Sequence, residues 1–157
     1  MPNPVHEIYG NKARIRACGI CMTEAGLLLV NHKHITNSDF WSPPGGGLEF
    51  GEDARQCVAR EVREETGLTV SVGDFLFVCE VLRPPLHAVE LFFLAQVRGG
   101  TLRTGHDPET GALTIVEEAR FFDDNQLAAV PPNQRHGLFG FAPKTAQIAG
   151  LRGYFKL

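Results

Sequence analysis

The chain has 157 residues, about one domain by length, and this is enough to bury a hydrophobic core without disulfides or a structural metal. Hydrophobic residues make up 43% and charged residues 21%, which is ordinary globular usage and excludes a disordered or fibrous chain. The net charge of -3 lacks the basic excess of a protein that binds phosphate backbones, so nucleic acid is not expected as the main partner.

The sequence also limits the compartment and the use of cysteine. No cationic stretch followed by an apolar run opens the chain, and no apolar run approaches a membrane span, so a cytoplasmic protein without a membrane partner is predicted. Cys18 and Cys21 form a CxxC, but there is no second CxxC and no zinc-spaced histidine pair. Buried thiols are therefore favoured over a zinc or redox site at the four cysteines.

The first third of the chain predicts an arm, two strands and a loop. Residues 1–13 hold two prolines and little hydrophobic periodicity, which is typical of an arm that frays or packs on a partner. Apolar runs from Arg14 to Cys21 and from Leu27 to His32 predict a hairpin of core strands around the turn at 23–26. Residues 37–47 are rich in Asn, Ser, Pro and Gly and predict a loop.

The clearest element is a helix from Glu52 to Thr66. This stretch holds no Gly or Pro, is rich in helix formers and opens with acidic residues. It stops at Gly67, which suits a C-terminal cap.

The remaining chain predicts further strands and short helices. Residues 69–82 and 88–97 are rich in Val, Phe and Leu and predict two strands joined by a turn at 83–86. A long loop is predicted over 98–111, a strand over 113–122, a helix capped by Asp123 and Asp124 through Ala129, and a short helix near 145–149 in a poorly patterned tail, 131–157. This order predicts a single mixed α/β domain over residues 1–157.

The helix gathers its acidic residues on one side. At about 100° per residue, Glu61, Glu64 and Glu65 share an arc of roughly 100° beside an apolar arc. Clustered carboxylates favour a cation, and oxygen-only ligands favour Mg²⁺ or Mn²⁺ over zinc. The alternative for these acids alone is a solvated helix face.

Three glycines, 45 to 47, precede the helix after two prolines. Such a backbone can take positive φ and approach a ligand closely, which would bring carbonyls or amides to the same metal and phosphate site. The alternative for the glycines alone is an ordinary turn.

The spacing of these features matches a known motif. From Gly46 the chain has five residues, then Glu52, seven more, then Arg60 and the run Glu-Val-Arg-Glu-Glu-Thr-Gly-Leu ending at Leu68. This segment resembles the Nudix box, GX5EX7REUXEEXGU with U aliphatic, and meets every specified position. Chance would give such a match in fewer than about one in a million chains.

The resemblance, which extends roughly over residues 14–129, implies the fold and the chemistry. The implied fold is an α/β/α sandwich with a mixed sheet and the box as a loop, helix and loop. The implied activity is that of a Nudix hydrolase, which cleaves nucleoside diphosphates linked to another group by attack of water, with Mg²⁺ as cofactor and Mn²⁺ as substitute.

The resemblance also implies roles for the box residues. Glu64 and Glu65 are implied as metal ligands and Glu61 as a ligand or the general base, with the carbonyl of Gly45 or Gly46 as a further ligand. Glu52 and Arg60 are implied as supporting residues, because the arginine holds the acidic cluster through charge-assisted hydrogen bonds.

Residues outside the box are less specified. Family members often take another acidic ligand from elsewhere, and the candidates are Glu117 and Glu118, then Glu90 and Glu109; the alternative for each is a surface acid. Glu90 and Glu118 are also candidates for substrate binding, as are Trp41 and Phe40, which could stack on a base or pack in the core. Residues 32–34, His-Lys-His, could steer phosphates or form a solvated loop.

The substrate class stays open at this point. Pro84 lies sixteen residues after Leu68, a spacing found in some family members that hydrolyse ADP-ribose, although Leu86 replaces the glycine expected in that group. The alternatives are a (d)NTP pyrophosphohydrolase of house-cleaning type and a non-catalytic module that binds a nucleotide derivative. The module is disfavoured because no box carboxylate is missing, and RNA decapping because a pI near 6.1 supplies no basic channel. Family habit predicts a homodimer.

Overall fold

The computed structural model describes residues 3–32, 38–103 and 118–157. Its first element is a short helix, α1 (Pro4–Tyr9), within the segment for which the sequence predicts an arm that frays or packs on a partner. The Asn3 side chain accepts a hydrogen bond from the Val5 N–H at 2.9 Å, and Val5 is buried. A cap and one buried side chain therefore give this segment its structure.

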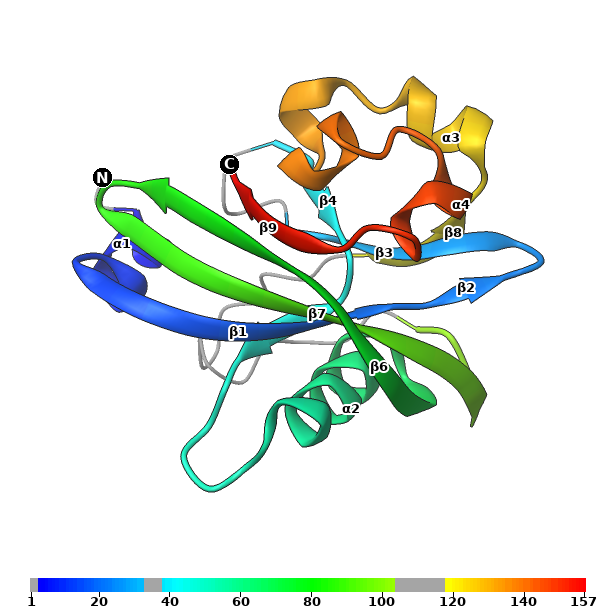
Figure 1. Ribbon diagram of the computed structural model, residues 1–157, viewed down its shortest axis with the longest axis horizontal. Helices are drawn as coiled ribbons and strands as arrows, with labels where there is room; N and C mark the ends of the chain where they lie inside the picture. The colour runs from blue at the N-terminus through cyan, green and yellow to red at the C-terminus, as the bar shows by residue number, and fades with distance from the viewer. Residues whose placement is uncertain (1–2, 33–37, 104–117) are drawn as a thin grey trace.

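A five-stranded mixed sheet forms the centre of the molecule (Figure 1). Its strands, in spatial order, are β5 (Gly45–Gly47), β1 (Lys12–Ile20), β7 (Leu86–Gly100), β6 (Leu68–Arg83) and β9 (Gly153–Lys156). β1 runs parallel to β7 and β9 runs parallel to β6, whereas the other pairs are antiparallel. The predicted mixed sheet is confirmed.

A second, antiparallel sheet contains β2 (Met22–Thr23), β3 (Gly26–Asn31), β4 (Trp41–Ser42) and β8 (Glu118–Phe122). The predicted turn at 23–26 joins two antiparallel strands, β2 and β3, and the Leu28 N–H donates to the Cys21 carbonyl at 3.0 Å. The prediction that the run from Arg14 pairs with β3 along its length is wrong. β1 uses both of its edges, for β5 and β7, so the chain changes sheet at Cys21 and β3 pairs with β2, β4 and β8 instead.

The predicted strands on either side of the turn at 83–86 form the long β6–β7 hairpin. β7 extends to Gly100, so the first residues of the predicted loop over 98–111 are strand. The rest of that loop from residue 104, and the predicted strand before Glu118, lie outside the described residues.

Helices cover both faces of the central sheet (Figure 1). One face carries α2 (Ala54–Thr66), and the other carries α3 (Asp124–Ala129), α4 (Thr145–Ile148) and two short 3₁₀ helices, Pro132–Gln134 and Gly137–Gly140. The α/β/α sandwich is confirmed, as are the helices predicted at 52–66, 123–129 and 145–149 within two residues at each end. Within the described part of the chain, no helix is long and apolar enough to cross a membrane.

Two short strands replace part of the loop predicted over 37–47. β5 consists of glycines, which have low strand propensity, but its pairing with residues 16–18 of β1 holds it in the sheet. It thereby lies between β1 and α2, at the edge of the central sheet. This edge is where the acidic helix face meets the glycine backbone.

Candidate active site

The helix α2 has a defined register because both of its ends are capped. Asp53 accepts the Gln56 N–H at 2.9 Å while the Gln56 side chain accepts the Asp53 N–H at 2.9 Å, and Gly67 ends the helix at φ 80°. Val58 and Val62 pack onto the central sheet at Gly19, where an added Cβ would lie 3.1 and 3.3 Å from them. Packing of this apolar side leaves the acidic side at β5.

Arg60 joins the carboxylates of this region. Its guanidinium donates to both oxygens of Glu52, from Nε at 3.1 Å and from Nη2 at 2.7 Å. Nη1 donates to Glu61 at 2.8 Å and to Glu64 at 3.3 Å, and Nη2 also donates to the Gly47 carbonyl at 3.1 Å. One side chain therefore orients three carboxylates and the end of β5.

The charges of this cluster stabilise one another. The hydrogen bonds from Arg60 lower the pKa of Glu52 to about 2, and the carboxylate of Glu52 raises the pKa of Arg60 above its ordinary value. Both groups are therefore charged at neutral pH.

Glu61 and Glu65 are almost completely buried, with 2% and 1% of their surface exposed. The Gly45 N–H donates to Glu65 Oε2 at 3.2 Å. A Cβ at Gly46 would lie 2.4 Å from the Glu61 carboxyl group, and a Cβ at Gly45 would lie 2.5 Å from Cys18 Sγ. The absence of a Cβ thus lets Gly45 lie against β1 and Gly46 lie against the Glu61 carboxylate.

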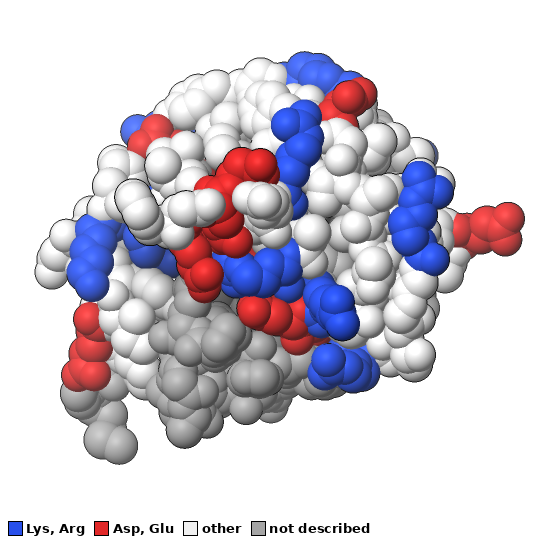
Figure 2. Space-filling view, turned by 90° about the horizontal axis from the view of Figure 1, so that it is seen from below, with Lys and Arg blue, Asp and Glu red and all other residues white. Residues whose placement is uncertain are grey.

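Glu64 is the most exposed of the three helix acids, with 31% of its side chain accessible. Figure 2 shows acidic and basic side chains side by side at the centre of the face that α2 covers. The cluster therefore opens to solvent on the side of Glu64 and is closed on the side of Glu61 and Glu65.

The donor set fits a hard divalent cation in chemistry. Carboxylate and carbonyl oxygens are the ligands that Mg²⁺ and Mn²⁺ prefer, and the nearby thiol of Cys57 is neutral because burial raises its pKa to about 12. In the described residues, however, no three His, Cys, Asp or Glu side chains converge closely enough to form a metal site. The guanidinium of Arg60 partly neutralises Glu52, Glu61 and Glu64.

A second polar cluster, which contains Glu90, contacts β5 through the Gly45 carbonyl. This residue of β7 is 2% exposed, its Oε2 accepts from Arg16 Nη1 at 2.6 Å, and its Oε1 lies 2.7 Å from His136 Nε2. Arg16 Nη2 also donates to the Gly45 carbonyl at 3.0 Å. Burial alone would raise the pKa of Glu90, but its contacts with His136 and Arg16 outweigh burial and lower that pKa.

Sequence reasoning missed Arg16 and His136. A signal for Arg16 was present, since arginines at 14 and 16 alternate along one face of an otherwise apolar strand. His136 lies in the weakly patterned tail, 46 residues from Glu90 in sequence, and had no local signal.

The aromatic candidates differ in position. Trp41 is 4% exposed, contacts Phe122 edge-on at 4.8 Å between ring centroids and has the guanidinium of Arg120 over its ring at 4.8 Å. Protein side chains thus contact the indole ring at its edge and over its face. This favours packing in the core over stacking on a substrate base. Phe40 is half-buried, and its backbone pairs with Asn31 and His32.

The acidic candidates beyond the box are also separated. Glu118 on β8 is exposed and lies 3.9 Å from Arg120. Glu109 and Glu117 lie outside the described residues, as do Lys33 and His34. His32 is buried, and its pKa is lowered to about 3 by burial and by the nearby Arg16, so it carries no charge to steer phosphates at neutral pH.

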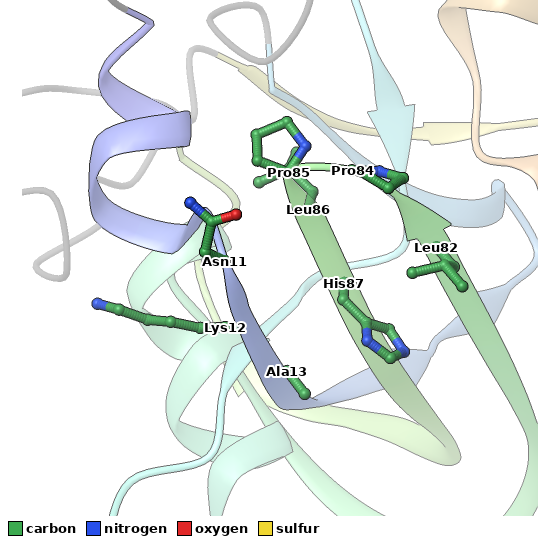
Figure 3. Close-up of a pocket in the computed structure, with 8 residues that line it drawn as sticks. All are labelled: Asn11, Lys12, Ala13, Leu82, Pro84, Pro85, Leu86 and His87. Carbon is green, nitrogen blue, oxygen red and sulfur yellow. The ribbon is translucent and has the colours of Figure 1, made fainter.

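Pro84 lies at the β6–β7 turn, beside a hollow of about 230 Å³. Figure 3 shows side chains from the start of β1 and from both arms of this turn around it. No box residue lines this hollow. A larger hollow of about 420 Å³ lies beside the box, lined by Tyr9, Arg14, Ile15 and Gly47 among others.

The four cysteines agree with the sequence prediction. All are buried and free, and burial raises the pKa of Cys21 and Cys79 to about 12. They are therefore neutral thiols packed in the core.

Comparison with known proteins identifies relatives of the chain. The model of the NUDIX domain matches residues 13–143. An ADP-ribose pyrophosphatase of Methanocaldococcus jannaschii is 34% identical over 111 residues, which cover 69% of this chain and 61% of that protein. An NAD-capped RNA hydrolase NudC of Stutzerimonas stutzeri is 30% identical over 145 residues, which cover 84% of this chain and 49% of that protein. The chain thus spans about three fifths or less of these relatives.

Solved structures with the same fold include a NUDIX hydrolase of Nitrosomonas europaea, with a TM-score of 0.65 and 19% identity, covering 92% of this chain and 79% of that one. An ADP-ribose pyrophosphatase of Streptococcus suis gives a TM-score of 0.61 and 19% identity, covering 90% and 98%. At these identities the likeness extends to the fold.

Proposed function

Because the chain belongs to the Nudix family, we propose that it hydrolyses the diphosphate bond of a nucleoside diphosphate linked to a second group, with a divalent metal as cofactor. The observation that carries this proposal is the cluster in which Arg60 binds Glu52, Glu61 and Glu64. A solvated helix face would not tie its acids to one internal arginine and to a glycine strand.

In this proposal the box residues divide the work. Glu61, Glu64 and Glu65, with the carbonyl of Gly45 or Gly46, hold Mg²⁺ or Mn²⁺, and one of the three carboxylates takes the proton of the attacking water. The bound metal supplies positive charge to the diphosphate oxygens and lowers the pKa of water. Arg60 and Glu52 fix the rotamers of the acids, which keeps their oxygens in place as charge develops on the phosphate.

We propose an ADP-ribose-like molecule as the substrate. The relative from Methanocaldococcus jannaschii supports this class by its name and by 34% identity. The NudC relative supports NAD-capped RNA as the second candidate. The net charge of -3 gives the chain no basic excess for an RNA backbone, which favours the small molecule over RNA. A cytoplasmic homodimer stays a prediction from the sequence.

The test is a turnover screen with Mg²⁺ over ADP-ribose, other nucleotide sugars, NAD, NAD-capped RNA and (d)NTPs, with products identified by mass. Water labelled with ¹⁸O marks the phosphorus that is attacked. Glu64→Gln is expected to remove at least about 99% of turnover while leaving the fold intact. Glu24→Gln, an exposed acid in the β2–β3 turn, is the charge-matched control and is expected to match wild type.

Three results would decide between the candidates. Turnover of one class that requires metal and Glu64 supports the proposal and names the substrate. Unchanged turnover in Glu64→Gln contradicts the residue roles. Tight binding of a nucleotide without turnover of any compound favours the non-catalytic module.

A further inference from the structure

A chain of polar contacts runs from the C-terminal segment to the buried acid of the box. It begins at His136, passes through Glu90 and Arg16, and reaches Gly45, whose N–H donates to Glu65. Each link is 3.2 Å or shorter. These four consecutive contacts thus connect residues that are far apart in sequence.

The direction of the first contact is fixed by the surroundings of the histidine. His136 Nδ1 accepts the Leu138 N–H at 3.0 Å, so this nitrogen carries no proton, and Nε2 must be the protonated nitrogen that donates to Glu90. The His136 N–H in turn donates to the Trp41 carbonyl at 2.9 Å. The imidazole is therefore held in one tautomer and one orientation.

Glu90 can satisfy both of its partners only as a carboxylate, since both Arg16 and His136 donate to it. A buried carboxylate that loses one donor is left with an unpaired oxygen, which is strongly unfavourable. The pair of donors therefore keeps Glu90 in place, and Glu90 keeps the Arg16 fork turned toward Gly45.

The Arg16 fork acts on the backbone that faces the box acids. Nη2 holds the Gly45 carbonyl, and the N–H of the same residue holds Glu65 Oε2. Both main-chain polar atoms of Gly45 thus bind side chains, the carbonyl that of Arg16 on β1 and the N–H that of Glu65 on α2. Rotation of this glycine would disturb both contacts together.

We infer that His136 and Glu90 are positioning residues for the box, which act through Arg16 and Gly45 to fix the orientation of Glu65. This inference rests on the proposed function, because it concerns the same metal-binding carboxylates. It assigns part of the active-site geometry to residues that lie outside the box and, for His136, in the tail. Neither residue touches the substrate in this role.

Mn²⁺ binding to the metal-free protein, measured by the electron paramagnetic resonance signal of free Mn²⁺, tests the inference without reference to turnover. His136→Leu removes the donor to Glu90 and is expected to weaken Mn²⁺ binding about tenfold, in line with the loss of other residues that orient metal ligands. His136→Gln keeps a side-chain N–H for Glu90 and an oxygen for the Leu138 N–H, so it is expected to retain most of the affinity. A purely structural role would not separate two folded variants in this way.

Two further variants keep the test decisive. Arg16→Lys retains the charge beside Glu90 but cannot bridge Glu90 and Gly45 together, so it is expected to bind Mn²⁺ as weakly as His136→Leu. If His136→Leu does not fold, the Mn²⁺ affinity of Arg16→Lys still tests the inference. Glu80→Gln is the matched control, because it removes the charge of a half-buried carboxylate that contacts His87 at 2.6 Å and Tyr154, and neither contact leads to the box.

The possible results separate this inference from the proposed function. Wild-type affinity for Mn²⁺ in folded His136→Leu or Arg16→Lys would overturn the positioning role while leaving the proposed function standing. A wild-type protein that binds no Mn²⁺ would overturn the metal proposal and the positioning role with it. Mn²⁺ binding that depends on His136, in a protein that hydrolyses no substrate, would support the positioning role and contradict the proposed activity.

Discussion

Two arginines donate hydrogen bonds to opposite ends of β5, and the side chains around the two arginines differ. Arg60 from α2 binds the Gly47 carbonyl and Arg16 from β1 binds the Gly45 carbonyl, and each side chain is 21% exposed. Arg60 joins Glu52 and Glu64, which are partly open to solvent, together with the buried Glu61, whereas Arg16 joins one buried carboxylate, Glu90, that is itself held by a histidine. The same type of side chain thus binds several acids in a cluster that opens to solvent and a single acid in a cluster that is closed to solvent.

This difference separates chemistry from stability. Ion pairs near solvent contribute little to folding, whereas breaking a buried pair leaves an uncompensated charge. The Arg60 cluster should therefore matter most for turnover and the Arg16 cluster most for the free energy of unfolding. Substitutions in the two clusters test this division.

The largest effect on stability is expected from Glu90→Ala. Loss of this carboxylate leaves Arg16 and His136 without their shared acceptor, and the free energy of unfolding should fall by about 3 to 5 kcal/mol. Urea denaturation measures it. Glu80→Ala, at the more exposed pair with His87 and at a contact with Tyr154, is the comparison and should lower the urea midpoint much less; equal losses in the two variants would remove the distinction between buried and half-exposed pairs.

A smaller loss of stability with a larger loss of turnover is expected from Arg60→Ala. Three carboxylates and the Gly47 carbonyl lose their common donor, so the unfolding free energy should fall by about 1 to 2 kcal/mol and kcat by roughly 10- to 100-fold. Denaturation and steady-state kinetics on the same preparation give both numbers. A stability loss equal to that of Glu90→Ala with normal kcat would reverse the proposed division.

Gly46→Ala is expected to act mainly on geometry. The new Cβ meets the end of the Glu61 side chain, which can move, so we expect about 1 kcal/mol of destabilisation and a kcat lowered roughly tenfold. Gly99→Ala on β7, where an added Cβ meets nothing within 4 Å, is the control. If both variants keep wild-type kcat, the close fit of β5 on Glu61 is not needed for turnover.

The smallest effect concerns acid pH. The pKa of Glu52 is lowered from 4.5 to about 2 in the folded protein, so its ionised form favours folding above pH 4.5, and this contribution is lost as the pH falls from 4.5 to 2. Glu52→Gln should therefore reduce the dependence of the melting temperature on pH in that window. Because the pKa of Glu90 is lowered too, part of the dependence should persist in this variant, and its complete loss would contradict a contribution from Glu90.

Elements whose structure is determined by neighbouring residues in the sequence could be predicted, and elements that depend on distant residues could not. The helix α2 carries its caps and its acidic face within one short stretch, and the β6–β7 hairpin carries its apolar residues and its turn, so both were predicted closely. The glycine strand β5 was missed because its structure comes from pairing with β1, and β9 because it depends on the edge of β6. The contacts of Glu90 were missed because its partners lie 74 and 46 residues away.

The last strand, β9, limits how short a fragment of this protein can be made. The match to the NUDIX domain ends at residue 143, yet β9 pairs with residues 77–80 of β6, and the Leu157 N–H donates to the Glu80 carbonyl at 2.9 Å. A fragment trimmed to the family boundary would expose the hydrogen-bonding edge of β6 and uncover Phe77, which β9 covers with Phe155. Bare strand edges of this kind pair with other copies, so such a fragment should aggregate where the longer chain does not.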